Sequence, residues 1–343
     1  MPPHTLCCDA TVRRLPGGEL AAFFTSGGDV EPNKANHIVV SRSTDDGDTW
    51  AAPEPVLRYH YKASMLSEVF VHDARITVIA QTHGGMFDHW RVWTLSSDDN
   101  GRHWSPPTPL QAMPQRAFIR NLYVATWGTW YLPFQYYPDG GEWAASPLEM
   151  PGGPQALNGC LISSDQGANW ERSATVGPVT GWANGLVWAE NNVTELSDGR
   201  LVMLIRADGT GRLFRSESID RGLTWSEPVP TDIPNPGSKF RLFRLTDGRI
   251  ALLHNPNPVT RHANSKVQAA VNRNPLALWM SADDMATWYS RRIVTEFPGM
   301  LAYPDGFVDE QAGLLHFAFD YNRHDVIYWG ARLPPPATGD GRS

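Results

Sequence analysis

The chain has 343 residues and a formal net charge of −7, and it contains 30 Gly, 28 Pro and 14 Trp. This composition excludes a disordered chain, which has few aromatic residues, and a helical bundle, which Gly and Pro at this frequency would interrupt. The acidic balance offers no attraction to nucleic acid, and no apolar stretch is long enough to cross a membrane as a helix. We therefore expect a turn-rich all-β protein with neither a nucleic-acid nor a membrane partner.

The N-terminus and the cysteines bear on the compartment. The first four residues, Met-Pro-Pro-His, lack the basic and then apolar pattern of a targeting segment. The three cysteines, Cys7, Cys8 and Cys160, are an odd number and two of them are adjacent, so they indicate no disulfide framework. These features favour a cytoplasmic protein, although a secreted protein whose leader had been removed would have the same sequence.

One turn motif recurs along the chain. It has the pattern S-x-D-x-G-x-x-W, and each copy follows a run of β-forming residues. The Asp side chain is expected to accept hydrogen bonds from the turn backbone, the Gly to adopt a positive φ and the Trp to pack against a neighbour. Met285 replaces the Gly in the last copy. The five copies of this Asp box span residues 43–50, 97–104, 163–170, 218–225 and 281–288.

A second kind of turn alternates with the first. Asp-Gly hairpin signals flanked by apolar residues occur at 196–201 and 245–250. Looser equivalents occur at 15–20, 71–76, 127–128 and 308–313. Two hairpins make one four-stranded blade, so the pattern predicts a single all-β domain over residues 1–333, a six-bladed β-propeller with Asp-box hairpins.

The turns also predict where each blade lies. We expect the N-terminal segment to supply a closing strand for the sixth blade, which has no Asp box, and the tail 334–343 to be disordered. The expected blades lie at roughly 10–55, 65–110, 118–175, 186–230, 240–293 and 301–333.

Two charged residues stand out from their strand context. Arg206 ends the apolar run 201–205, and Glu190 begins the partner strand of the same Asp-Gly hairpin. Counting outward from Asp198-Gly199 places Glu190 within about one residue of the position opposite Arg206. Spacing alone favours a simple ion pair.

The segment 190–206, together with the Asp boxes, resembles the sialidase (neuraminidase) superfamily in its bacterial branch of Asp-box, or BNR-repeat, proteins. The resemblance continues through 245–256, 273–281, 302–305 and 313–316, and so covers nearly the whole chain. Asp boxes also occur in non-catalytic propellers, whereas the ordered Glu–Arg–Arg–Tyr set is more specific. The resemblance implies an enzyme, an exo-acting glycoside hydrolase that removes a terminal acidic sugar without a metal or cofactor.

The resemblance also implies how a substrate carboxylate is bound. Arg206 and Arg273 fall at the second and third positions of the family's arginine cluster. Planar guanidinium groups bind a carboxylate in bidentate fashion, which suits an acidic sugar. The first arginine is missing: Cys8 stands at its place, and Arg13 and Arg14 lie further on in a strand context that does not match. Besides sialic acid, a uronic or another ulosonic acid therefore remains open as the substrate.

The implied catalytic residues come from three separate segments. Tyr303 falls at the nucleophile position and Glu190 at the position of its base. A neutral phenol avoids the repulsion that a carboxylate nucleophile would meet beside the substrate carboxylate. Asp29 lies in the loop that carries the family's acid/base residue, and Glu31 is a rival for that role.

Two other functions remain open. Several histidines near predicted loops, with Tyr303 or Tyr61, would suit a lyase acting on a uronate-containing glycan. A non-catalytic glycan-binding propeller would carry the same Asp boxes. The histidines considered for the lyase are His37, His60, His83, His89, His254 and His262.

Overall fold

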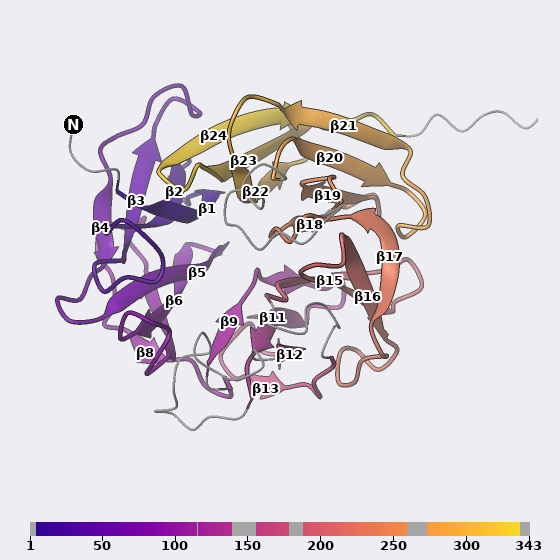
Figure 1. Cartoon of the computed structure of the whole chain (residues 1–343), viewed down its shortest axis with the longest axis horizontal. Coiled ribbons are helices and arrows are strands. Elements are labelled where there is room, and N and C mark those ends of the chain that lie inside the picture. Colours follow the sequence, from indigo (N-terminus) through magenta and orange to yellow (C-terminus); the bar gives the residue numbers. More distant parts are fainter. Residues whose placement is uncertain (1–4, 115, 139–155, 178–187, 259–272, 337–343) are drawn as a thin grey trace, which may run out of the picture.

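The computed structural model describes residues 5–114, 116–138, 156–177, 188–258 and 273–336. This part of the chain contains strands and turns but no helix, and hence no helix that could cross a membrane. Six antiparallel sheets follow one another around a central axis (Figure 1). The chain is an all-β six-bladed β-propeller, as the turn pattern predicts.

In the first three blades, neighbouring strands pair in chain order, and the third blade carries an extra strand, β9, beside β11. Their strands are β1 (Cys7–Arg14), β2 (Leu20–Ser26), β3 (His37–Ser43), β4 (Glu54–Leu57), β5 (Ala63–His72), β6 (Arg75–His83), β7 (Arg91–Ser97), β8 (Thr108–Pro109), β9 (Ala117–Ile119), β10 (Tyr123–Val124), β11 (Trp130–Tyr136), β12 (Leu157–Ser163) and β13 (Glu171–Arg172).

The last three blades follow the same order, with four, four and three strands in the described part of the chain. Their strands are β14 (Asn191–Glu195), β15 (Leu201–Arg206), β16 (Arg212–Ser218), β17 (Val229–Pro234), β18 (Arg241–Arg244), β19 (Ile250–His254), β20 (Leu276–Ser281), β21 (Ser290–Thr295), β22 (Leu301–Asp309), β23 (Leu314–Tyr321) and β24 (Asp325–Arg332).

Each Asp box joins the third strand of a blade to the outermost strand. In the first copy, Ser43 Oγ accepts a hydrogen bond from the Gly47 amide at 2.9 Å, and Asp45 Oδ1 accepts one from the Thr49 amide at 2.9 Å. In the last copy, Met285 takes the glycine position with φ 66° and donates the equivalent bond to Ser281 Oγ at 2.9 Å. The expected turn chemistry is confirmed, and it lies at the outer turns.

The ring closes differently from the sequence prediction. Strand β1 pairs with β2 inside the first blade and does not complete the sixth. A short turn separates β1 from β2, so their pairing requires little loop-closure entropy. The first and sixth blades meet through side chains, such as Trp50 and Tyr328 with ring centroids 5.2 Å apart, and through a backbone hydrogen bond from the Cys7 amide to the Arg323 carbonyl. Residues 337–343 of the tail that we expect to be disordered lie outside the described residues.

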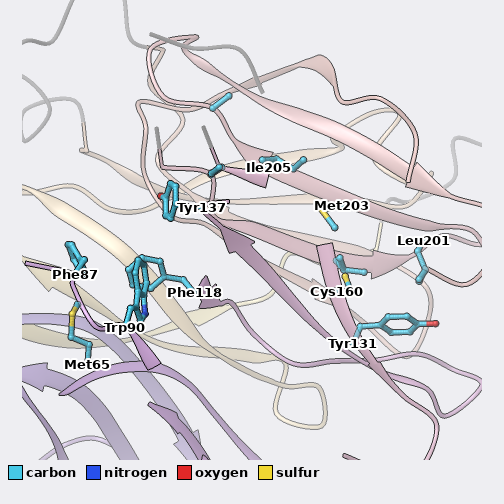
Figure 2. Packing of buried hydrophobic residues seen from close by; sticks show 14 of the residues in the cluster. Met65, Phe87, Trp90, Phe118, Tyr131, Tyr137, Cys160, Leu201, Met203 and Ile205 are labelled. Carbon is cyan, nitrogen blue, oxygen red and sulfur yellow. The ribbon is translucent and has the colours of Figure 1, made fainter. Parts of the chain in front are cut away.

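The hydrophobic core lies between neighbouring blades. The cluster in Figure 2 joins the second, third and fourth blades, with Phe87, Trp90 and Phe118 grouped at one end. The rings of Trp90 and Phe118 meet edge to face with centroids 4.2 Å apart, a favourable aromatic geometry. Burial of such apolar surface between sheets fixes the blades around the axis.

The inner strands carry a buried ionic network. Arg13 on β1 pairs with Glu68 on β5 at 2.6 Å and with Asp305 on β22 at 3.2 Å. Arg241 on β18 lies 3.5 Å from Glu68 and 3.6 Å from Asp305. Burial acts to raise the pKa of Asp305, but Arg241 and Arg13 outweigh it and lower that pKa to about 2. Two cationic and two anionic side chains, one from each of four blades, therefore neutralise one another.

Candidate active site

A pocket of about 540 Å³ gathers side chains from all six blades. The five predicted site residues, Asp29, Glu190, Arg206, Arg273 and Tyr303, all line it, as does Glu31. Another hollow, of about 580 Å³ between the second and third blades, contains none of them. The structure therefore brings together residues separated by up to 274 positions (303 − 29) in the sequence.

Glu190 and Arg206 are adjacent, as the hairpin count predicts. The Arg206 amide donates to the Glu190 carbonyl at 2.8 Å, and Arg206 Nη1 donates to both carboxylate oxygens of Glu190 at 2.9 Å. Both side chains are almost fully buried. Burial acts to raise the pKa of Glu190, but Arg206 and Arg120 outweigh it and hold that pKa below its ordinary value. Glu190 is therefore a carboxylate at neutral pH, as a base must be.

Arg206 is also the link between Glu190 and Tyr303. Its Nη1 lies 3.3 Å from the Tyr303 hydroxyl oxygen, and its Nε donates to Asp208 Oδ1 at 2.6 Å. Asp208 Oδ2 in turn accepts from the Trp188 amide at 3.2 Å, which fixes the orientation of the guanidinium. In the described part of the chain no direct hydrogen bond joins Glu190 to Tyr303, so the two share Arg206 as a common partner.

A local irregularity directs Tyr303 toward the pocket. The register of β22 against β23 shifts between Ala302 and Asp305, and Tyr303 has φ 58°. A bulge of this kind re-aims a side chain that a regular strand would place elsewhere. The left-handed backbone is costly for a non-glycine residue, by about 1–3 kcal/mol, and such strain clusters at functional sites. The inner strand β1 shifts register in the same way, with Asp9 at φ 52°.

Arg273 lies over the face of Tyr303, with its guanidinium carbon 4.9 Å from the ring centroid. Its Nη2 donates to the Gly237 carbonyl at 2.7 Å, whereas its buried Nε has no hydrogen-bond partner among the described residues. In the same part of the chain, no carboxylate oxygen lies within 4.0 Å of a nitrogen of the Arg273 guanidinium, which is the limit for an ion pair. A buried cation of this kind is well placed for an anionic ligand.

The loop between β2 and β3 contributes two carboxyl groups. Asp29 is exposed and accepts a hydrogen bond from Asn33 Nδ2 at 3.2 Å. Glu31 is largely buried and pairs with Arg323 through its Oε2. Burial raises the pKa of Glu31 in spite of the nearby Arg323. Both remain candidates for the acid/base role.

Cys8 has no exposed surface and lies beside the pocket, with its Sγ 3.9 Å from Glu31 Oε2. Burial raises the pKa of its thiol well above the ordinary value, so the thiol is neutral. Neither neighbouring arginine takes the missing position. Arg13 belongs to the axial ionic network, and Arg14 pairs with Asp46 at 2.9 Å on the surface.

Sequence reasoning missed four charged residues around the pocket. Arg120 and Arg323 line it, and so does Asp9, which has Lys239 Nζ at 3.6 Å. Arg120 Nη2 lies 3.7 Å from Glu190. Arg120 follows the apolar run 117–119 as Arg206 follows 201–205, so the same signal would have found it. Arg323 lies in a polar hairpin turn and gave no such signal.

Cys8, Asp9 and Glu31 could each offer one ligand atom to a metal, since these atoms lie within 4.8 Å of one another. The two carboxylates already have cationic partners, Lys239 for Asp9 and Arg323 for Glu31. A metal ion would have to compete with both, so the donor set fits a metal poorly.

The comparisons with known proteins support the fold. The structure is similar to the Hadza microbial sialidase Hz136, with a TM-score of 0.73 and 16% identity over 96% of this chain and 66% of that one. It is similar to a protein of unknown function from Dyadobacter fermentans, with a TM-score of 0.70 and 18% identity over 96% and 94% of the chains. It is also similar to the intramolecular trans-sialidase from Ruminococcus gnavus, with a TM-score of 0.63 and 14% identity over 95% of this chain and 94% of that one.

Identities this low show a shared fold. The chain spans 66% of the length of the Hadza sialidase, which is just under two thirds. No curated protein sequence matches. The model of the BNR repeat-like domain matches residues 18–317, which is most of the chain. Together with the observed Asp boxes, this match shows that the chain belongs to the BNR repeat-like domain family.

Proposed function

We propose that the chain is an exo-acting, sialidase-like glycoside hydrolase that removes a terminal acidic sugar. One observation carries the proposal. Arg206 Nη1 contacts both Glu190 and the Tyr303 hydroxyl, while Arg273 lies over the Tyr303 ring with no carboxylate partner in the described part of the chain. The pocket thus combines a shielded phenol, an ionised carboxylate beside it and a cation available to an anionic ligand.

The cations explain the choice of an acidic sugar. The chain as a whole has a charge of −7 and does not attract anions at long range. Inside the pocket Arg273 and Arg206 are both almost fully buried, where a hydrogen bond to a carboxylate is stronger than in water. Arginine also matches the planar geometry of a carboxylate. Specificity for an acid therefore rests on these local groups.

The chemistry follows from the same contacts. The Tyr303 oxygen attacks the anomeric carbon, its proton passes to Glu190, and the bond from that carbon to the leaving oxygen breaks. An acid residue of the β2–β3 loop protonates the leaving oxygen. The same residue then acts as a base and removes a proton from a water molecule that attacks the anomeric carbon; the bond from that carbon to the Tyr303 oxygen breaks, and Glu190 returns the proton to Tyr303. Arg206, which contacts both side chains, keeps Glu190 and Tyr303 close together for the transfer of the Tyr303 proton.

We assign the acid/base role to Asp29, with Glu31 as the alternative. Asp29 is exposed on the loop that lines the pocket and can reach a leaving group that extends outward. Glu31 forms an ion pair with Arg323, which makes it less available to a leaving group. The raised pKa of Glu31 nevertheless favours the protonated form that an acid needs.

Part of the pocket lining is aromatic. Phe87, Phe118 and Trp188 line it, and the rings of Phe118 and Trp188 lie 5.4 Å apart between centroids. Aromatic faces of this kind pack against the apolar side of a sugar or its acyl group. Charged and aromatic groups in one pocket suit a sugar that carries both a carboxylate and an apolar face.

The lyase alternative gains little support. The described histidines considered for it do not line this pocket, and His262 lies outside the described residues. Burial lowers the pKa of His83 to about 4 and that of His254 to about 3, which makes both poor bases at neutral pH.

Turnover of sialosides and uronides, followed by NMR of the products, tests the proposal. We expect a saturated sugar, and a loss of at least about 10³-fold in kcat for Tyr303→Phe with an unchanged thermal midpoint. An unsaturated product that absorbs in the ultraviolet would indicate the lyase instead. Binding without turnover on any acidic glycan would indicate a glycan-binding propeller.

Substrates with different leaving groups separate Asp29 from Glu31. An aryl glycoside leaves readily without protonation, whereas a sugar leaving group needs the acid. The acid residue is the one whose amide variant, Asp29→Asn or Glu31→Gln, loses turnover of the sugar-linked substrate much more than of the aryl substrate. Equal losses on both substrates for Asp29→Asn would contradict our assignment.

A further inference from the structure

The turn between β23 and β24 brings a cation into the pocket from the last blade. Asn322 and Arg323 occupy this turn, with φ values of 52° and 61°. The Asn322 amide donates to the Met300 carbonyl at 3.0 Å, and the Arg323 carbonyl accepts from the Cys7 amide at 2.9 Å. The turn is thus fixed from two sides, and one of its attachments is the residue before Cys8.

Cys8 and Arg323 meet at one carboxylate oxygen. Glu31 Oε2 lies 3.9 Å from Cys8 Sγ and pairs with Nη2 of Arg323. The short side chain of Cys8 is completely buried, so a long arginine side chain at position 8 would compete for the space around Glu31 that the Arg323 guanidinium now uses. A small residue at position 8 and an arginine in the β23–β24 turn are therefore sterically compatible, whereas arginines at both positions would compete for the same space.

Arg323 also faces the reacting groups. Its guanidinium carbon lies 5.5 Å from the centroid of the Tyr303 ring, and that of Arg273 lies 4.9 Å from the same centroid. A guanidinium has five N–H donors, so the pairing of one nitrogen with Glu31 leaves donors for a second acceptor. The Arg323 side chain keeps 23% of its surface exposed, and the residue lines the pocket.

We propose that Arg323 replaces the missing first arginine and binds the substrate carboxylate together with Arg206 and Arg273. This inference rests on the proposed function for the acidic ligand, but it concerns binding and not turnover. The third guanidinium comes from the last blade instead of the first, and Glu31 acts as its anchor. Cys8 is the small residue that makes this exchange sterically feasible.

The test is calorimetric titration of the full chain with 2,3-didehydro-2-deoxy-N-acetylneuraminic acid and with its methyl ester. We expect the wild type to prefer the acid. Arg323→Ala should weaken binding of the acid about 10- to 100-fold, as for a lost charge-assisted hydrogen bond, and leave ester binding nearly unchanged. Arg323→Lys should recover only part of the preference, because lysine lacks the planar fork. Arg75→Ala, which breaks an exposed pair with Asp98, is the control.

Two further variants keep the test decisive. Arg323→Ala leaves Glu31 without its partner, so the double variant with Glu31→Gln provides a folded alternative, checked by thermal unfolding. In the double variant Cys8→Arg/Arg323→Ala, the guanidinium comes from β1 and not from the β23–β24 turn, and we expect the preference for the acid to recover. A folded Cys8→Arg/Arg323→Ala protein without that recovery would overturn the exchange.

The remaining outcomes separate this inference from the proposed function. If Arg323→Ala, or its Glu31→Gln double variant, distinguishes acid from ester as well as the wild type does, Arg323 does not bind the carboxylate. A wild type that binds both probes equally, or neither, also overturns the inference. If the acid preference depends on Arg323 but no acidic glycoside is turned over, the inference stands and the hydrolase proposal fails.

Discussion

The variant Glu190→Gln tests the electrostatic arrangement of the pocket most directly. It removes a charge that accepts two bonds from Arg206 at 2.9 Å and lies 3.7 Å from Arg120. At an effective dielectric constant of about 20, a pair of charges at that longer distance interacts by about 4–5 kcal/mol. Arg206 keeps Asp208 at 2.6 Å, and an uncharged glutamine is easier to bury. We therefore expect a net loss of about 2–3 kcal/mol, below the about 3–5 kcal/mol typical of a fully unpaired buried charge.

Thermal unfolding and turnover measure the two consequences of Glu190→Gln. The midpoint should fall by about 3–4 °C, and kcat should fall by about 10²- to 10⁴-fold, because in the proposed mechanism Tyr303 loses its base. The folded-state pKa of Glu190 is lowered from 4.5, so its stabilisation is present above that pH and is lost as the pH falls through the lowered value. The difference in stability between the wild type and the variant should therefore shrink below pH 4.5.

A matched control is Glu195→Gln at the other end of β14. This buried carboxylate accepts from Thr126 and lies outside the pocket, so turnover should not change. A Glu190→Gln variant that unfolds at the wild-type temperature and turns over substrate at the wild-type rate would contradict both the stabilising and the catalytic role of Glu190.

Three further predictions concern the scaffold. Arg13→Met should lower the free energy of unfolding by about 3–5 kcal/mol in a denaturant titration, because Glu68 and Asp305 lose a shared cation, and adding Glu68→Leu should restore part of it. Gly306→Ala should destabilise by about 3 kcal/mol or more, since its Cβ would lie 1.9 Å from the His316 carbonyl oxygen, whereas Gly330→Ala, with nothing within 4 Å, should stay within about 0.5 kcal/mol. Asp165→Ala should lower the unfolding midpoint through lost bonds from Ser163 and Asn169 and leave kcat unchanged; a large effect on kcat would contradict the purely structural role of the Asp boxes.

The blades could be predicted because their signals are local. Each Asp box is closed by bonds within a few residues, as between Asp45 and Thr49, so the sequence segment contains the whole turn. The position of Glu190 opposite Arg206 followed from counting along one hairpin, and the 2.8 Å backbone bond between them confirms it. Local patterns of this kind do not depend on the rest of the fold.

The rest of the site could not be predicted because it depends on contacts between blades. Arg323 and Cys8 are separated by more than 300 positions, and only the closed ring brings both to Glu31. The prediction that the N-terminal segment supplies a strand of the sixth blade was wrong for a related reason. Turn signals show that two strands are available but not which sheet edge they join, and here the short β1–β2 connection decides.

The closure of the ring has a consequence for how the protein resists heat. The first and sixth blades share no paired strands in the described part of the chain, and a backbone hydrogen bond from Cys7 to Arg323 crosses this seam beside the pocket. Irreversible inactivation depends on the rate at which such a seam opens. A ligand that binds as proposed to Arg273, Tyr303 and the β2–β3 loop would span the seam and slow that opening. Bound ligand should therefore lengthen the lifetime of the protein at elevated temperature, because it would connect the first blade to the fifth and sixth blades.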